Sequence, residues 1–242
     1  MPSISYNINL PKEWTNKSYD KFIKDLFSLG NKNLKEFNEK IIFTKYPILG
    51  INSIILKGII KKIAKTNIED YLKVRKRNYY EEVLIEGILI SYIKEYDQFI
   101  NYLYQFLPSI DNWALCDQSV SSYKIIKKNK EKFMKEIDQL LNSKNEYDVR
   151  VGIVSLLNYY IDEEYLMIIF KKIDQLNRKE YYIEMAIAWL VSIMYIKYPK
   201  ETIKYLKKNT LSKTTQNKAI QKIRDSKRVS QEAKDDLLQY KK

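Results

Sequence analysis

Trp113 and Asp117 are the two side chains in this sequence whose types and spacing best suit chemistry. They stand four residues apart in the segment Asp111-Asn-Trp-Ala-Leu-Cys-Asp117, so a helix would place them on one face, one turn apart. The indole face attracts a cationic group, and a carboxylate stabilises a positive charge that develops during a reaction. Taken alone, an aspartate on a helix is more commonly a solvated surface residue.

Arg150 and Trp189 follow at intervals that suggest a repeat. Arg150 comes 37 residues after Trp113, and Trp189 comes 39 residues after Arg150. Because residues one repeat apart stack on the same surface of a repeat protein, we expect these three residues and Asp117 to line one concave groove. The alternatives are that Trp189 packs in the core and that Arg150 pairs with an acidic residue near the start of its own helix.

The composition excludes several kinds of active site. Histidine is absent from the 242 residues, which excludes Ser-His-Asp and Cys-His catalysis and zinc bound through histidine. A single cysteine, Cys116, excludes an internal disulfide and any CxxC site, and no glycine-rich phosphate loop occurs. We therefore expect no metal and no cofactor, which leaves carboxylate, lysine or unassisted hydroxyl chemistry. Lysine-based lyase chemistry is a weaker alternative, because no lysine lies in an apolar helical pattern that would lower its pKa.

The net charge of +13 is concentrated in two segments. Residues 124–135 contain six lysines and one acid, and residues 198–242 contain thirteen basic and five acidic side chains, so the two segments account for the whole net charge. Clusters of this kind suit a polyanion, because each neutralised phosphate releases counterions. Lys124, Lys127 and Lys128 follow the Trp113 segment closely enough to reach the same duplex, although a solvated face would carry the same residues.

The hydrophobic pattern predicts an all-α protein. Prolines occur only at positions 2, 11, 47, 108 and 199, so helices can run uninterrupted between them. Residues 83–93, 151–157 and 185–196 are apolar almost all round, which requires cover on both sides, whereas residues 131–141 and 163–176 are amphipathic. Alternation of the two kinds about every 35 residues is typical of a helical solenoid.

Helix ends and boundaries can also be predicted. Thr66 to Glu69 has the spacing of a capping box, Asp111 and Asn145 can each cap a helix, and Pro199 suits a first helical turn. We expect a single domain over residues 1–242, with an N-terminal extension at 1–15 and basic C-terminal helices at 198–242. The sequence has no apolar stretch long enough to span a membrane and no recognisable leader, so we expect the protein to stay in the cytoplasm. We also expect a monomer.

With these motifs in order, the chain resembles the AlkD family of DNA alkylation repair glycosylases. Members of that family carry Trp-x-x-x-Asp on one helix, an arginine on the next repeat and a tryptophan after Ala-x-x on the following one, which correspond here to Trp113, Asp117, Arg150 and Trp189. The similarity runs from about Phe22 to Ser230. Supporting matches are Leu49-Gly50-Ile51, Tyr79-Tyr80-Glu81-Glu82-Val83 and the tail that begins at Asn217-Lys218-Ala219.

The resemblance implies a right-handed superhelical solenoid of paired antiparallel HEAT-like helices. It also implies hydrolysis of the N-glycosidic bond of N3- and N7-alkylated purines in double-stranded DNA, without a pocket for a flipped base. Asp117 would be the catalytic carboxylate, Trp113 and Trp189 would hold the cationic nucleotide, and Arg150 would bind a flanking phosphate. A cationic purine leaves as a neutral base and needs no general acid, which agrees with the absence of histidine.

The chain departs from the family pattern at three positions. Asn52 and Ile54 stand where many members have arginine and proline after Leu-Gly-Val, and Ser192 stands where the characterised branch has arginine three residues after the second tryptophan. Two other functions therefore stay open. One is a non-catalytic DNA binder that recognises damaged or branched DNA, and the other is a HEAT scaffold that binds a partner protein.

Overall fold

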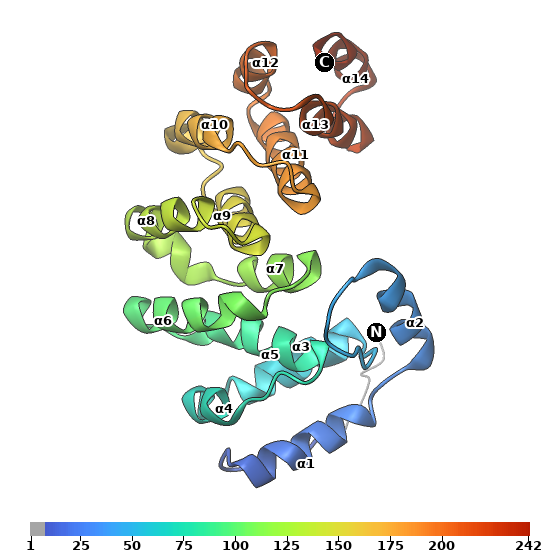
Figure 1. Cartoon of the computed structure of the whole chain (residues 1–242), viewed down its shortest axis with the longest axis vertical. Coiled ribbons are helices and arrows are strands. Elements are labelled where there is room, and N and C mark those ends of the chain that lie inside the picture. The colour runs from blue at the N-terminus through green and yellow to red at the C-terminus, as the bar shows by residue number, and fades with distance from the viewer. Residues whose placement is uncertain (1–7) are drawn as a thin grey trace. The chain divides into compact units, whose positions relative to one another are not determined.

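The computed structural model describes residues 8–242, which contain fourteen α-helices, five 3-10 helices and no strand (Figure 1). This confirms the predicted all-α class. The α-helices are α1 (Asn16–Phe27), α2 (Lys32–Ile41), α3 (Ser53–Ile63), α4 (Ile68–Val74), α5 (Tyr80–Leu89), α6 (Tyr96–Phe106), α7 (Trp113–Val120), α8 (Lys130–Leu141), α9 (Glu146–Tyr159), α10 (Leu166–Gln175), α11 (Tyr181–Lys197), α12 (Pro199–Lys207), α13 (Lys213–Asp225) and α14 (Gln231–Asp236). Across residues 8–242, no helix combines the length and apolar character that crossing a membrane requires.

The chain divides into two compact units, the first ending at Ile125 and the second beginning at Ile126. Helices α1 to α7 belong to the first unit and α8 to α14 to the second, with the 3-10 helix η3 (Lys124–Lys128) at the division. The single continuous domain and the right-handed superhelical solenoid stay predictions.

In the first unit, α5 is the central helix. It packs against α3, α6 and α7, while α1 packs against α4 (Figure 1). Nine of its ten residues are buried, which confirms the predicted cover on both sides. Gly87 allows the close approach, because a Cβ there would lie 2.1 Å from Ser119 Oγ on α7 and 2.5 Å from the Phe106 ring on α6. A side chain at this position would push α7, the helix with the Trp-Asp motif, away from α5.

The second unit repeats this arrangement with other helices. α9 packs against α8 and α11, and α11 packs in turn against α12 and α13 (Figure 1). α9 and α11 are buried over most of their length, as the sequence predicts. The predicted amphipathic helix at 131–141 corresponds to α8. The one predicted at 163–176 is divided into the 3-10 helix η4 (Glu163–Tyr165) and α10.

Two of the predicted helix ends are confirmed. Asn145 caps α9, because its side-chain oxygen accepts hydrogen bonds from the amides of Tyr147 (2.8 Å) and Asp148 (3.4 Å). Pro199 is the first residue of α12, where its missing N–H costs no helical hydrogen bond.

The other two predicted caps are wrong, in each case by one residue. Asn67, not Thr66, caps α4 by accepting from the amide of Asp70 at 3.2 Å. Thr66 instead accepts from the indole N–H of Trp14 at 2.8 Å. Asn112, not Asp111, caps α7 by accepting from the amide of Leu115 at 3.0 Å. Because an asparagine follows each expected cap, spacing alone did not decide between the two neighbours.

Trp14, in the described part of the N-terminal extension, packs in the core, whereas most of the residues around it are exposed or part-exposed. Its side chain is 5% exposed, and its ring lies edge-on to Tyr71 at 4.9 Å and to Phe22 at 5.4 Å between centroids. Residues 1–7 of the predicted extension lie outside the described part of the chain.

Candidate functional site

Trp113 and Asp117 lie on the part-exposed side of α7. Both side chains are half-buried, while the three residues between them are buried against the core. The indole N–H of Trp113 donates to the carbonyl oxygen of Ile41, the last residue of α2, at 3.1 Å. The tryptophan is thereby held in place, with Asp117 one turn further along the same helix.

Asp111, immediately before α7, holds the loop that follows α2. Its two carboxylate oxygens accept from the Thr44 hydroxyl, both at 2.9 Å, and one of them accepts from the amide of Lys45 at 2.7 Å. The residue that was expected to cap α7 therefore ties residues 42–46 to the start of this helix, close to the point where Trp113 bonds Ile41.

Two adjoining cavities, of about 120 and 280 Å³, lie over α3, α5 and α7 in the first unit. Both are lined by Gln118, the residue after Asp117, whose amide nitrogen donates to the Tyr80 hydroxyl at 3.3 Å. Burial raises the pKa of the Tyr80 phenol above its ordinary value. Lys57 and Lys61, both exposed and one turn apart on α3, line the second cavity. These two lysines were not among the residues predicted from the sequence, although their four-residue spacing on a largely apolar helix was a usable signal.

Glu81 explains two of the matches that supported the family resemblance. This carboxylate is 2% exposed and accepts hydrogen bonds from the consecutive amides of Leu49 (2.9 Å), Gly50 (2.8 Å) and Ile51 (3.3 Å). The Leu-Gly-Ile and Tyr-Tyr-Glu-Glu segments are thus two halves of one structural contact. The next residue, Asn52, accepts from the amide of Ile54 at 2.9 Å as the cap of α3.

In the second unit, Arg150 is 5% exposed on α9, and its Nη1 donates to the carbonyl oxygen of Tyr182 on α11 at 2.7 Å. The amide of Tyr182 donates in turn to Glu146 Oε1 at 2.9 Å. These bonds tie the first turn of α11 to α9. Binding of phosphate by Arg150 stays a prediction.

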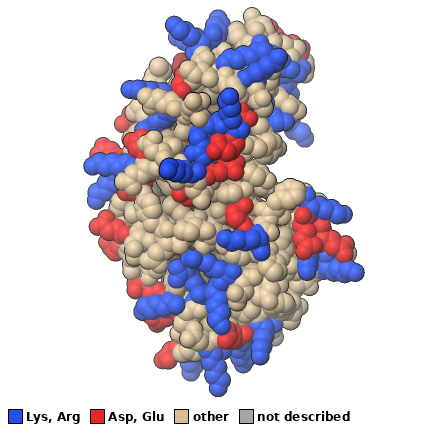
Figure 2. Space-filling model, viewed as in Figure 1, with Lys and Arg blue, Asp and Glu red and all other residues tan. Residues whose placement is uncertain are grey.

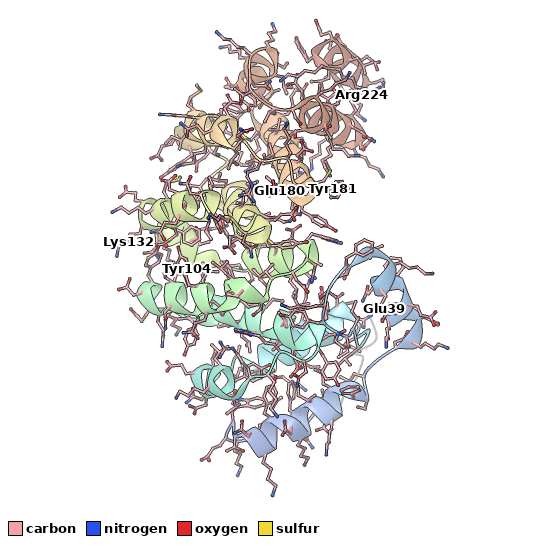
Figure 3. The ribbon with its side chains drawn as sticks, viewed as in Figure 1. Glu39, Tyr104, Lys132, Glu180, Tyr181 and Arg224 are labelled. Carbon is pink, nitrogen blue, oxygen red and sulfur yellow. The ribbon has the colours of Figure 1, made fainter. Side chains whose placement is uncertain are left out.

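Trp189 is half-buried on α11. Three residues later, Ser192 stands where the family pattern has arginine. Ser192 is 3% exposed and its hydroxyl donates to the carbonyl oxygen of Trp189 at 2.7 Å. The first residue of α11, Tyr181, is 64% exposed and lies beside Glu180 (Figure 3). Glu180 accepts from Arg178 at 2.8 Å, which lowers the pKa of the Glu180 carboxyl.

Exposed basic residues occur in both predicted clusters. Lys124, Lys127 and Lys128 are exposed on η3. Further lysine and arginine side chains gather over α12 to α14 (Figure 2). Among residues 8–242, no group of three or more His, Cys, Asp or Glu side chains is placed to hold a metal ion.

The predicted site residues are divided between the two units. Trp113 and Asp117 belong to the first unit, and Arg150 and Trp189 belong to the second. That all four line one groove stays a prediction.

The protein is all-α, with a hydrogen-bonded tryptophan, a carboxylate one turn away on the same helix, and exposed lysines. These features define a class of helical protein suited to a polyanionic ligand. The chain belongs to the DNA alkylation repair enzyme family, whose model matches residues 22–223. This confirms the resemblance to the AlkD family, and the membership supports a role in DNA alkylation repair with DNA as the substrate. A search of the curated proteins found no match to this sequence.

Proposed function

We propose that the protein is a monofunctional DNA glycosylase that hydrolyses the N-glycosidic bond of N3- and N7-alkylated purines in duplex DNA. The observation that carries the proposal is the part-exposed face of α7, where Trp113 is fixed by its hydrogen bond to Ile41 and Asp117 follows one turn later. The proposal includes a monomer in the cytoplasm that needs no metal or cofactor, and a HEAT-like solenoid built from the two units.

In the proposed reaction, the bond between C1′ and the purine nitrogen breaks, and its electron pair leaves with the base. Because the alkylated purine carries a positive charge, it departs as a neutral molecule and needs no proton from the protein. The sugar becomes an oxocarbenium-like cation, which the Asp117 carboxylate stabilises. Asp117 also orients the water that adds to C1′ and accepts its proton.

The other residues would bind the substrate. Trp113 and Trp189 would place aromatic faces against the cationic nucleotide, an interaction worth about 2 kcal/mol when it is desolvated. Arg150 would bind a flanking phosphate, and Lys124, Lys127 and Lys128 would bind phosphates further along the duplex.

The test is release of free base from duplex DNA that contains N7-methylguanine. Asp117→Asn keeps the size of the side chain and removes its charge, so base release should fall about 10²- to 10³-fold in a single-turnover assay. Affinity for DNA should change little, because phosphate contacts elsewhere dominate it.

Asp97→Asn is the matched control, because it removes the same charge from an exposed position on α6 of the same unit. Its rate should equal that of the wild type. Equal rates for Asp117→Asn and the wild type would show that Asp117 is not the catalytic carboxylate.

A second candidate function is a non-catalytic binder of damaged or branched DNA on the same scaffold. It is favoured by two of the three departures from the family pattern. Ser192 is buried and its hydroxyl donates to the Trp189 carbonyl oxygen, and Asn52 caps α3, so neither residue offers the basic group of the family pattern. Tight binding of N7-methylguanine duplexes by the wild type, with no base release, would support this function over the first.

A further inference from the structure

Helix α2 and the loop after it present apolar side chains to solvent. None of the ten residues of α2 is buried. Phe37 is 58% exposed, Ile41 41% and Phe43 70%. A single exposed apolar residue is ordinary, but three within seven residues, two of them aromatic, indicate a contact surface.

The backbone on both sides of Phe43 is fixed. Two positions before it, the carbonyl of Ile41 accepts the indole N–H of Trp113. One and two positions after it, the Thr44 hydroxyl and the Lys45 amide donate to Asp111. Because the backbone on both sides of Phe43 is hydrogen-bonded, this segment loses little conformational entropy when the ring contacts a partner. The smaller entropic cost favours binding.

The anchors connect Phe43 to the proposed site. Both Trp113 and Asp111 stand at the start of α7, so a DNA duplex whose damaged nucleotide faces Trp113 would lie against the same loop. The charge of the surroundings fits a polyanion as well. Residues 32–45 contain four lysines and two glutamates. Both glutamates pair with lysines on their own helix, as at Lys35 and Glu39, 3.8 Å apart. Glu39 lies on α2 (Figure 3).

We propose that Phe43 is a wedge that inserts beside the damaged nucleotide and stacks on a neighbouring base of the duplex. The inference rests on the proposed function and adds a residue that determines recognition. Apolar side chains inserted at a base step unstack it and bend the duplex, and aromatic rings stack on any base. For a site that does not flip the base into a pocket, such a wedge would hold the step open and favour damaged over intact DNA.

The experiment measures both affinity and base stacking. The duplex carries a tetrahydrofuran abasic-site analogue with 2-aminopurine opposite it, in the position from which the inserted ring would displace a base, and the fluorescence of 2-aminopurine rises when it leaves the stack. Binding of the wild type should raise the fluorescence. Phe43→Ala should abolish the rise and weaken binding to this duplex about 10-fold, with little change for an undamaged duplex. Phe43→Trp should keep most of both signals, and thermal melting of each variant should match the wild type because the ring is exposed.

Phe37→Ala is the comparison variant, since it removes another exposed ring of the same contact surface, on α2 and six residues before Phe43. The fluorescence rise should survive in it, because Phe37 is not the inserted ring. A fluorescence rise that survives in Phe43→Ala, or an equal loss in Phe37→Ala, would overturn the wedge while leaving base release by the wild type intact. If the wild type binds neither duplex, the proposed function itself fails, and the wedge fails with it.

Discussion

Gly50 is the residue on which the loop between α2 and α3 depends. Its φ is +79°, in the left-handed region that favours glycine, and a Cβ would lie 2.5 Å from both the Asn31 carbonyl oxygen and the Lys35 amide nitrogen. Its own amide donates to Glu81, and its carbonyl accepts from the Asn31 amide at 3.1 Å. The same residue thus joins α2, α5 and the start of α3.

We expect Gly50→Ala to lower the free energy of unfolding by about 2 to 4 kcal/mol, because the strained φ and the backbone clash act together. Urea denaturation followed by circular dichroism measures the change. A loss below about 0.5 kcal/mol would mean that the loop relaxes freely and does not fix the start of α2.

At the scale of elements, α5 combines three buried glutamates with different tasks. Glu81 binds the loop amides, and Glu82 accepts from the amides of Asn78 and Tyr79 and from the Tyr19 hydroxyl. Glu86, fully buried, pairs with Arg75 Nε at 2.5 Å and with Arg77 Nη2 at 2.7 Å. The bond to Glu86 raises the pKa of Arg77. These three glutamates thus bind α1, residues 49–51 and residues 75–79 to α5, the helix against which α7 packs.

Glu86→Gln should destabilise the protein by about 3 to 5 kcal/mol, because it leaves two guanidinium groups next to a buried neutral amide. The midpoint and slope of urea denaturation give the value.

Glu36→Gln is the control, since the Glu36–Lys32 pair on α2 is exposed and 3.9 Å long. It should cost less than about 1 kcal/mol. If both variants lost similar amounts of unfolding free energy, burial of the Glu86 ion pairs would add nothing to their contribution to stability.

At the scale of the whole molecule, charge is the property that concerns a DNA partner. The net charge of +13 lies in the segment around η3 and in the C-terminal helices, where exposed lysines predominate (Figure 2). Reversing Lys124, Lys127 and Lys128 together to glutamate should weaken binding to duplexes of any sequence. It should also flatten the slope of log affinity against log salt by up to about 3, one contact per lysine.

The matched control reverses Lys17, Lys21 and Lys24 on α1, which are also exposed and change the net charge equally. Fluorescence anisotropy at several salt concentrations compares the two triple variants. Identical slopes would assign the effect to net charge alone and return the η3 lysines to a solvated face.

The sequence by itself determined the helical class, the family and the helices that are covered on both sides. The apolar pattern around Val83 and Val151 predicts burial correctly because the period of a helix is fixed by local backbone geometry. The Trp113-to-Asp117 spacing places both side chains on one side of α7 for the same reason.

The partners of individual polar groups were decided only by tertiary structure. Asp111 binds a loop 66 residues away instead of capping its own helix, and Arg150 donates to a carbonyl 32 residues away. Phe43 is left in solvent while Trp14, near the start of the chain, is buried. Helix capping and periodicity are local properties, but a hydrogen bond between distant segments depends on how the helices pack. Single-sequence spacing carries no information about that packing.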